Sequence, residues 1–332
     1  MGNLFSERRK IIGTNLSLPT FGLGTAHLGE LYERVEEDIS QATFEVAWSS
    51  GVRYFDTAPW YGFGRSERVV GDMIRGSDYT LSDKVGRLLE PGAVKNPMDF
   101  GMIDPLPFTV RYDYSYDGIM RAYEDNLQRL GLDRIDILLA HDIGKFQHGS
   151  ENFEHFKALE DSGYSAMDEL RKTGKVKAIG LGVNENQVCQ DALNIGEWDV
   201  FLLAGRYTLL EQTPLDTLFP ACAAAGTSII CGGPFNSGVL VGRDMWNYAQ
   251  APEEVTQKAR ALGTVADEFN IPLAAAALQF PLGHQIITSV IPGPRNAFEL
   301  RQIVDWFKIP IPDEFWSALL ERRLIEEHAP LP

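Results

Sequence analysis

The stretch from Ile135 to Asp142 reads IDILLAHD, an almost continuous apolar run that ends in two polar residues. Such runs are typical of parallel strands that are covered on both faces. Because successive side chains of a strand alternate between its faces, Ile137, Leu139 and His141 share one face. The stretch therefore predicts a buried strand that carries an imidazole at its carboxyl end.

Similar short apolar stretches recur along the chain with amphipathic segments between them. The other predicted strands are residues 20–26, 53–58, 80–86, 177–183, 200–205, 228–233 and 288–293. The predicted helices include residues 41–50, 66–75, 117–130, 186–195 and 214–225. This alternation indicates repeated βα units, and eight strands favour a closed (β/α)₈ TIM barrel of the α/β class. An open doubly wound sheet is the alternative, because strand patterns alone do not show closure.

No linker or low-complexity tract divides the chain, so we expect a single domain over residues 1–332. Within it we expect an N-terminal extension at 1–18 and a C-terminal helix at 313–327. Two long connections, 87–116 and 143–164, follow the third and fourth strands. Active sites of such barrels lie at the carboxyl ends of the strands. We therefore expect these connections to line a substrate pocket rather than to be surface loops without a role in binding.

The composition excludes some classes of partner. With 46 acidic and 30 basic residues the formal net charge is −16, which repels nucleic-acid phosphates and anionic lipid surfaces. The sequence shows neither a signal peptide nor an apolar run long enough to span a bilayer. We expect a cytoplasmic protein with a small-molecule substrate, no nucleic-acid partner and no membrane partner. The sequence does not indicate an oligomeric state.

The cysteines and the N-terminus carry weaker signals. Cys189, Cys222 and Cys231 have neither metal-ligand spacing nor an even number, so we expect reduced structural thiols and no metal site. The first six residues, MGNLFS, fit the short pattern for N-myristoylation. That pattern is common, and a frayed polar terminus is the preferred interpretation.

Four polar residues are predicted at one rim of the barrel: Asp56, Tyr61, Lys84 and His141. Each alone has an ordinary explanation, as a turn cap, a loop aromatic, a surface charge or a core histidine. Together they supply an acid, a cation that lowers its pKa, a carboxylate that holds the cation, and an imidazole donor. A tyrosine has a pKa of about 10, so Lys84 is expected to lower the pKa of Tyr61 toward neutral pH.

These four groups suit hydride transfer between a nicotinamide cofactor and a carbonyl or hemiacetal carbon. In reduction, Tyr61 and His141 would donate hydrogen bonds to the developing alkoxide. In oxidation, the phenolate of Tyr61 would act as the base.

The segment 55–67, FDTAPWYGFGRSE, resembles the signature of the aldo-keto reductase superfamily. DKVGR around Lys84, LLAHD around His141 and KAIGLGV at the fifth strand resemble further landmarks, so the resemblance covers residues 20 to 325. It implies that the four rim residues form that family's catalytic tetrad.

Three later segments resemble the D-threo-aldose 1-dehydrogenase and pyridoxal 4-dehydrogenase subgroup of that family. They are AGRYTLLEQ from Ala204, GGPFNSGVL from Gly232 and IPGPRNAFELRQ from Ile291. This resemblance implies oxidation of a hemiacetal or alcohol carbon of a small sugar or pyridoxal-like substrate to a lactone. An NADPH-dependent aldehyde reductase and a non-catalytic nucleotide-binding regulatory subunit remain alternatives, since fold does not fix function. The intact tetrad favours catalysis.

The residues expected to contact the cofactor lie at the ends of several strands. Glycines between 232 and 240 let backbone amides approach a pyrophosphate, and the helix that follows residues 293–296 offers its N-terminus to a phosphate. The stretch 22–25, GLGT, lacks the third glycine of a Rossmann fingerprint. The expected cofactor-binding residues are Gly24, Thr25, Asn184, Gly232, Gly233, Pro234, Phe235, Gly238, Leu240, Gly293, Arg295 and Glu299.

Glu299 favours NAD as the cofactor. It stands where NADP-preferring relatives often carry Arg or Gln, and a carboxylate suits a ribose hydroxyl. Arg295 could instead bind a 2′-phosphate, which leaves NADP as the alternative.

The resemblance also implies altered contacts to the nicotinamide. The family's Ser-Asn pair for the carboxamide appears here as Asn184-Glu185, and Ala204 replaces the usual Gln. Gly232 stands where a tyrosine usually stacks on the nicotinamide ring. Of these positions, Asn184 keeps an amide that can bind the carboxamide.

Overall fold

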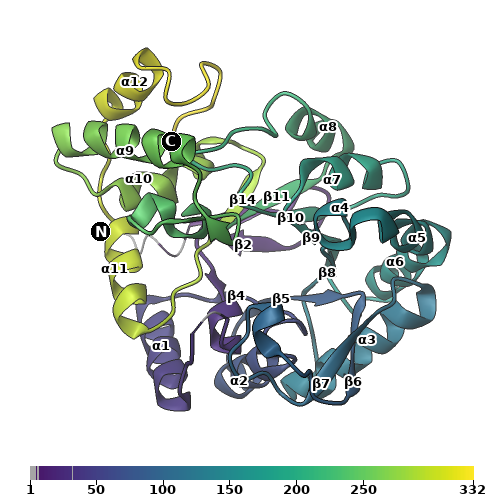
Figure 1. The fold of residues 1–332 in the computed structure, drawn as a ribbon. Helices are drawn as coiled ribbons and strands as arrows, with labels where there is room; N and C mark the ends of the chain where they lie inside the picture. The colour runs from purple at the N-terminus through teal and green to yellow at the C-terminus, as the bar shows by residue number, and fades with distance from the viewer. Residues whose placement is uncertain (1–4, 6, 32) are drawn as a thin grey trace.

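The computed structural model describes residue 5 and residues 7–31 and 33–332. Its centre is an eight-stranded parallel sheet in the order β14-β11-β10-β9-β8-β5-β4-β3. All eight predicted strands are present (Figure 1). They are β3 (Leu23–Gly24), β4 (Tyr54–Asp56), β5 (Thr80–Val85), β8 (Ile137–His141), β9 (Ala178–Val183), β10 (Val200–Ala204), β11 (Ser228–Gly232) and β14 (Ile287–Ile291). Of the MGNLFS segment, only Phe5 lies within the described residues.

The first and last strands meet, which closes the sheet. Phe21 forms a parallel bridge with Val290. Beside it the amide of Gly22 donates to Val290 O over 3.0 Å, and that of Gly24 donates to Pro292 O over 2.9 Å. The predicted (β/α)₈ barrel is therefore confirmed, and the open doubly wound sheet is excluded.

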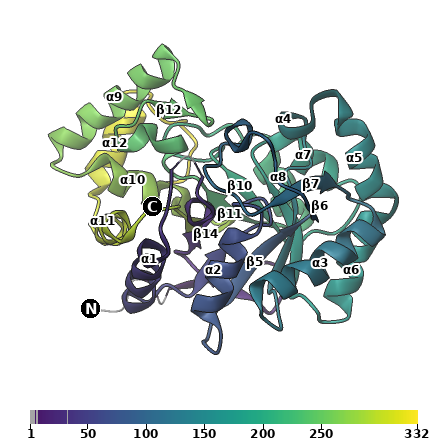
Figure 2. The ribbon, with the colours of Figure 1, turned by 60° about the horizontal axis from the view of Figure 1, so that its bottom comes forward.

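Helices surround the barrel, and each of the five predicted helices overlaps one of them (Figures 1 and 2). They are α1 (Glu37–Ser50), α2 (Arg65–Ile74), α3 (Tyr116–Leu130), α6 (Tyr164–Lys172), α7 (Asn186–Ala192), α8 (Leu218–Ala225), α9 (Glu253–Glu268), α10 (Leu273–Gln279), α11 (Ala297–Phe307) and α12 (Asp313–Glu321). Among the described residues, no helix has the length and apolar character needed to cross a membrane.

The C-terminal helix is shorter than predicted. We expected it to span residues 313–327, but α12 ends at Glu321. Arg323 then adopts a left-handed backbone with φ of 55°, a conformation that an α-helix cannot continue through.

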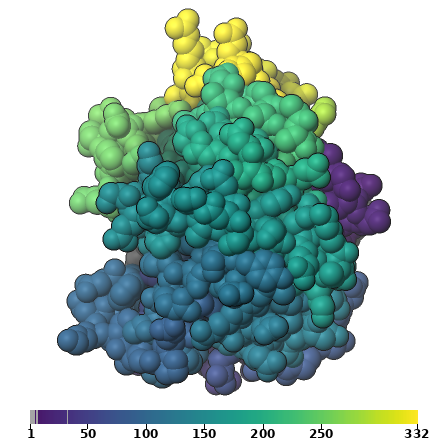
Figure 3. Space-filling model, turned by 90° about the vertical axis from the view of Figure 1, so that its right-hand side faces the viewer, coloured from purple at the N-terminus to yellow at the C-terminus, as the bar shows by residue number. Residues whose placement is uncertain are grey.

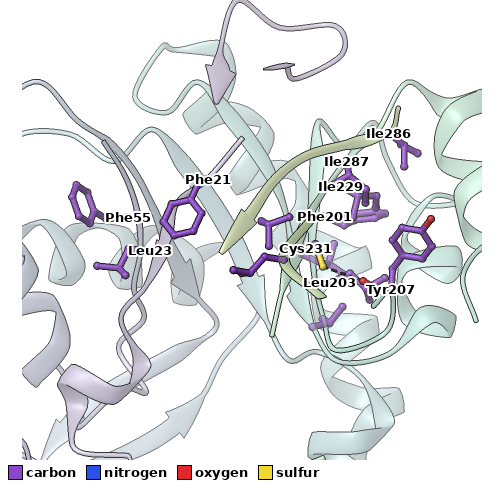
Figure 4. Packing of buried hydrophobic residues seen from close by; sticks show 14 of the residues in the cluster. Phe21, Leu23, Phe55, Phe201, Leu203, Tyr207, Ile229, Cys231, Ile286 and Ile287 are labelled. Atoms are coloured by element: carbon purple, nitrogen blue, oxygen red, sulfur yellow. Dashed lines mark hydrogen bonds between the residues drawn. The ribbon is translucent and has the colours of Figure 1, made fainter. Parts of the chain in front are cut away.

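Two layers of apolar side chains stabilise the barrel. The larger layer fills the space between the strands and the surrounding helices (Figure 4). The smaller layer joins side chains of the barrel strands, such as Leu139 and Leu202, to Ile11, Leu16 and Leu18 from a hairpin of β1 (Arg8–Lys10) and β2 (Ser17–Pro19). Much of the predicted N-terminal extension thus packs against the floor of the barrel, opposite the rim that carries the polar residues.

Both long connections contain regular structure. Residues 87–116 form an antiparallel hairpin of β6 (Arg87–Pro91) and β7 (Phe108–Tyr112) with a 3₁₀ turn, Pro97–Phe100, between them. Residues 143–164 are mostly helical, with α4 (Lys145–His148), a 3₁₀ turn (Gly149–Glu151), α5 (Asn152–Ala158) and a π-turn (Leu159–Gly163) that leads into α6.

A third connection, after β11, forms a 3₁₀ segment (Asn236–Val241) and a small hairpin of β12 (Met245–Trp246) and β13 (Ala249–Gln250). Residues near 100 lie at the bottom and the C-terminal segment lies at the top (Figure 3).

Candidate active site

A buried ion pair joins two adjacent strands at the rim. Asp56 is the last residue of β4, and Lys84 stands in β5 beside it. Lys84 Nζ lies 2.7 Å from Asp56 Oδ2, and the two side chains are only 2% and 4% exposed. The ammonium also donates to Thr57 O over 2.8 Å, and the Ser82 hydroxyl donates to Asp56 Oδ1 over 2.6 Å. Burial opposes the charge of Lys84, but Asp56 together with Tyr61 and Asp83 outweighs burial and raises the pKa of the ammonium.

Tyr61 lies on the turn after β4, held there by two glycines. The backbone of Gly29 packs so closely on Tyr61 that a Cβ at residue 29 would come within 2.3 Å of Tyr61 C. Gly62 has φ of +66°, which favours glycine. The ring centroid of Tyr61 lies 4.9 Å from Lys84 Nζ and 6.0 Å from the His141 ring. The structure thus brings the four tetrad residues together.

The pKa of Tyr61 differs from the sequence-based expectation. Burial raises the pKa of the phenol above its usual value, and Lys84 lowers it by less. The charge of Lys84 lowers the pKa of Tyr61, as expected. In the protein without a cofactor, however, this effect is too small to bring the pKa of the phenol toward neutral pH. Burial could not be judged from the sequence.

His141 ends β8 and is 5% exposed. Burial, with the nearby charges of Arg87 and Lys84, holds the pKa of its imidazole well below the usual value. Nδ1 has no hydrogen-bond partner among the described residues. His141 is therefore a neutral imidazole, and such a ring donates through one N–H.

Three residues that the sequence analysis did not predict lie around His141: Arg87, Asp142 and Tyr114. Arg87, 1% exposed, pairs with Asp142 over 2.7 Å between Nη2 and Oδ2. The hydroxyl of Tyr114 donates to His141 O over 2.6 Å and lies 3.0 Å from His148 Nε2. Arg87 and Asp142 belong to the quoted segments DKVGR and LLAHD, but nothing in the sequence pairs them.

An aromatic cluster joins the turn that holds Tyr61 to the first long connection. Trp60, Phe63 and Phe100 meet edge to face with centroids 5.7 to 5.8 Å apart. Phe63 and Met102 are fully buried, whereas Trp60 is partly exposed beside Tyr61. Most of these side chains therefore pack the connection itself, and Trp60 is the member that adjoins the tetrad.

The predicted cofactor residues Gly24, Gly232 and Gly293 lie at neighbouring strand ends. Gly232 is paired with Ile291, the last residue of β14, and a Cβ on Gly293 would lie 3.6 Å from Gly24 O. Thr25 differs, because its buried hydroxyl donates to Asp56 O over 2.7 Å and lies 2.8 Å from Ser66 Oγ. Its side chain supports β4 and is not directed at a ligand.

The segment after β11 offers mainly backbone. Pro234, Gly238 and Leu240 are buried, and the partly buried Phe235 packs against Trp306 with ring centroids 6.3 Å apart. Gly233 is exposed and has φ of +57°. These positions can contact a cofactor through backbone amides, as expected of the glycines, but Leu240 offers no exposed side chain.

Glu299 and Arg295 belong to a set of charges that we call the α11 cluster: Glu33, Arg243, Arg295 and Glu299. Glu299 Oε1 accepts from Arg295 Nε and Arg243 Nη2, each over 2.8 Å, and Glu33 Oε2 lies 3.0 Å from Arg295 Nη1. Burial would raise the pKa of Glu299, but its bonds with Arg295 outweigh burial and lower it. Glu33 and Arg243 were not predicted, since both are far from Glu299 in sequence.

The amide of Asn184 is held at both ends. Nδ2 donates to Asp142 Oδ1 over 3.1 Å, and Oδ1 accepts from the Tyr248 hydroxyl over 3.2 Å. An amide has two N–H groups and two acceptor lone pairs, so these bonds leave one of each. That remainder matches the donor and acceptor of a primary carboxamide, so Asn184 fits a nicotinamide. Glu185 has a partner elsewhere, since its Oε1 accepts from Phe146 N over 2.8 Å.

Comparisons with known proteins identify the family of the chain. Residues 20–322 match the model of the aldo/keto reductase family. The chain is 44% identical to pyridoxal 4-dehydrogenase of Microbacterium luteolum, over 96% of this chain and 98% of that protein. It is 35% identical to D-threo-aldose 1-dehydrogenase of a Pseudomonas species, over 93% of this chain and 95% of that protein.

Solved structures show the same fold. The aldo-keto reductase AKR11C1 from Bacillus halodurans, in its holo form, superposes with a TM-score of 0.75 at 21% identity, over 96% of both chains. The glycerol dehydrogenase AKR11B4 from Gluconobacter oxydans gives 0.74 at 20% identity, over 100% of this chain and 98% of that one. With the closed barrel and the family match over most of its length, the chain belongs to the aldo/keto reductase family and is an NAD(P)-dependent oxidoreductase.

Proposed function

We propose that the protein oxidises the hemiacetal or alcohol carbon of a small sugar or pyridoxal-like compound, yielding a lactone from a cyclic hemiacetal. The observation that carries this proposal is the assembly of Tyr61 beside the buried Asp56–Lys84 pair and the neutral His141. The names of the two relatives support the substrate class, since one is a pyridoxal and the other an aldose dehydrogenase. Pyridoxal and aldoses share a chemical feature, because both can close on their own hydroxyl to a cyclic hemiacetal.

The chain's residues divide the reaction into two transfers. When bound, an oxidised nicotinamide supplies the hydride acceptor and a positive charge. The hemiacetal carbon loses its hydrogen as hydride while the Tyr61 phenolate takes the proton of the hydroxyl, so that the C–O bond becomes a carbonyl. Lys84 stabilises the phenolate, and Asp56 holds Lys84 in place. The neutral imidazole of His141 orients the reacting oxygen with a hydrogen bond.

For the cofactor we propose NAD, with NADP as the alternative. If the ribose of the cofactor binds beside Glu299, the negative charge of this carboxylate would disfavour a 2′-phosphate there. The two arginines that hold Glu299 favour the alternative, because both would bind a phosphate if the carboxylate turned away. In the present arrangement Glu299 and Glu33 together balance the two positive charges, which supports NAD.

A panel of L-fucose, L-galactose, D-arabinose and pyridoxal, each with NAD and with NADP, tests the proposal. We expect NAD reduction with at least one of them, and an initial product that mass spectrometry finds two hydrogens lighter than the substrate. Reactions with short-chain aldehydes and NADPH test the reductase alternative. Efficient aldehyde reduction without oxidation of any panel member would overturn the proposed direction, and binding of dinucleotide without turnover in either direction would favour a regulatory subunit.

A further inference from the structure

The proposed proton and hydride transfers assign no role to a buried charge pair beside the tetrad, although one member, Asp142, has its Oδ2 3.4 Å from His141 Nε2. Arg87 begins β6 and Asp142 directly follows His141. The side chain of Arg87 is 1% exposed and that of Asp142 is 18% exposed. A buried ion pair is weak support for stability, because desolvation of both ions offsets much of their attraction. Stability therefore does not explain why this ion pair lies beside the tetrad.

The backbone of Asp142 directs its carboxylate. Asp142 has φ of +44°, an uncommon conformation for a residue with a side chain. Its amide donates to Gly182 O over 2.9 Å, which ties this turn to β9. From there Oδ2 accepts from Arg87 and Oδ1 accepts from Asn184 Nδ2.

Arg87 is itself fixed on several sides. Its guanidinium lies 4.4 Å from the Trp60 ring centroid and 5.8 Å from that of Tyr112. Nη2 also donates to Gln147 Oε1 over 3.2 Å, and Gln147 Nε2 donates to the Tyr112 hydroxyl over 3.0 Å. The pair thus connects both substrate-side connections to the end of β9.

We propose that Arg87 and Asp142 are positioning residues that set the amide of Asn184 for the carboxamide of the nicotinamide. This inference rests on the proposed role of Asn184 in cofactor binding. A charged carboxylate can only accept hydrogen bonds, so Asp142 requires the NH₂ end of the Asn184 amide to face it. Arg87 keeps Asp142 charged and in place against the burial that raises the pKa of its carboxyl. In this arrangement Asn184 binds the carboxamide without help from the next residue, because Glu185 accepts a hydrogen bond from Phe146 N instead.

Two ligands separate this role from a general effect on the fold. NAD carries the nicotinamide, and ADP-ribose is the same molecule without it. Their dissociation constants would be measured by calorimetry for the wild type, Asp142→Ala, Asp142→Asn and Arg87→Lys. If NADP binds more tightly than NAD, NADP and 2′-phospho-ADP-ribose take their places. Glu185→Gln is the matched control, since Glu185 adjoins Asn184 but bonds elsewhere.

We expect Asp142→Ala to weaken NAD binding roughly tenfold, as the loss of a hydrogen bond to a charged group predicts, and to leave ADP-ribose binding within about twofold. Asp142→Asn, which keeps an acceptor oxygen, and Arg87→Lys, which keeps the charge, should lose less. Glu185→Gln should leave the ratio of the two constants unchanged.

Equal effects of Asp142→Ala on both ligands, or no effect on either, would overturn the inference while the proposed function stands. The same holds if Asp142→Ala does not fold and neither conservative variant changes the ratio. A wild-type protein that binds NAD no more tightly than ADP-ribose would overturn both the inference and the proposed role of Asn184.

Discussion

The tetrad and the α11 cluster both rest on carboxylates paired with cations, but the two regions differ in exposure. The Lys84 and Asp56 side chains are 2% and 4% exposed. In the α11 cluster Arg295 is 31% exposed and Glu33 is 40% exposed. Water screens the exposed pairs, so they contribute little energy and can exchange partners, whereas breaking the buried pair leaves a charge without water. We therefore expect the first region to be rigid and the second to adapt to a ligand.

Tyr61→Phe tests the catalytic side of the comparison and has the largest expected effect. The variant keeps the ring beside Lys84 and His141 but removes the group that accepts the proton. We expect kcat for the best substrate to fall about 10³-fold, within the range for loss of a general acid or base. Dissociation constants for NAD, measured by fluorescence, should change less than about twofold. Turnover equal to that of the wild type would exclude Tyr61 as the acid and base.

Lys84→Met tests the rigidity of the buried pair. It leaves Asp56 buried without its cation, so we expect the free energy of unfolding, measured in urea, to fall by about 3–5 kcal/mol. The double variant Lys84→Met/Asp56→Asn removes both charges and should recover part of that loss. In the α11 cluster the matched change Arg295→Met should cost at most about 1 kcal/mol. Equal losses for Lys84→Met and Arg295→Met would show that burial does not distinguish the two regions.

The sequence predicted the tetrad because Asp56, Lys84 and His141 lie at or near the ends of apolar strands, and Tyr61 follows the first of these strands closely. Arg87, Asp142 and Asn184 meet from three different segments, and no local pattern links residues so far apart in the chain. Glu33 and Arg243 were missed for the same reason. The helices of 143–164 were hidden because Gly149 and a π-turn interrupt their periodicity. The raised pKa of Tyr61 depends on burial, which is a property of the folded chain.

Two histidines extend the comparison to pH. His141 adjoins the cations Arg87 and Lys84, and its pKa is lowered well below 6.5. His27 lies near the α11 cluster, where burial lowers its pKa. The hydrogen bond with Leu31 O and the charges of Glu33 and Glu299 oppose the effect of burial, and Arg243 adds to it. We expect nuclear magnetic resonance to find His141 neutral down to a lower pH than His27. The reverse order would contradict the electrostatic difference between the two regions.

The lowered pKa of His141 also has a consequence for stability. Below the unfolded pKa of about 6.5, the unfolded chain takes up a proton that the folded imidazole does not. The contribution of His141 to the free energy of unfolding therefore falls as pH decreases, by up to about 1.4 kcal/mol per pH unit. Comparing urea unfolding of the wild type and His141→Gln at pH 7.5, 6.5 and 5.5 isolates this term from the carboxyl groups. A difference between the two proteins that is constant with pH would contradict it.

Glu299→Gln has the smallest expected effect on the fold and tests whether the α11 cluster adapts. Removing the charge leaves Arg295 and Arg243 without their shared carboxylate, so both could bind a 2′-phosphate. We expect the ratio of kcat/KM for NADP to that for NAD to rise roughly tenfold, as one added charge-assisted contact predicts, with a stability change below about 1 kcal/mol. Glu268→Gln, which breaks the exposed pair with Arg322 on the outer surface, is the control and should leave that ratio unchanged. An unchanged ratio in Glu299→Gln would place the choice of cofactor outside the α11 cluster and remove the main support for NAD.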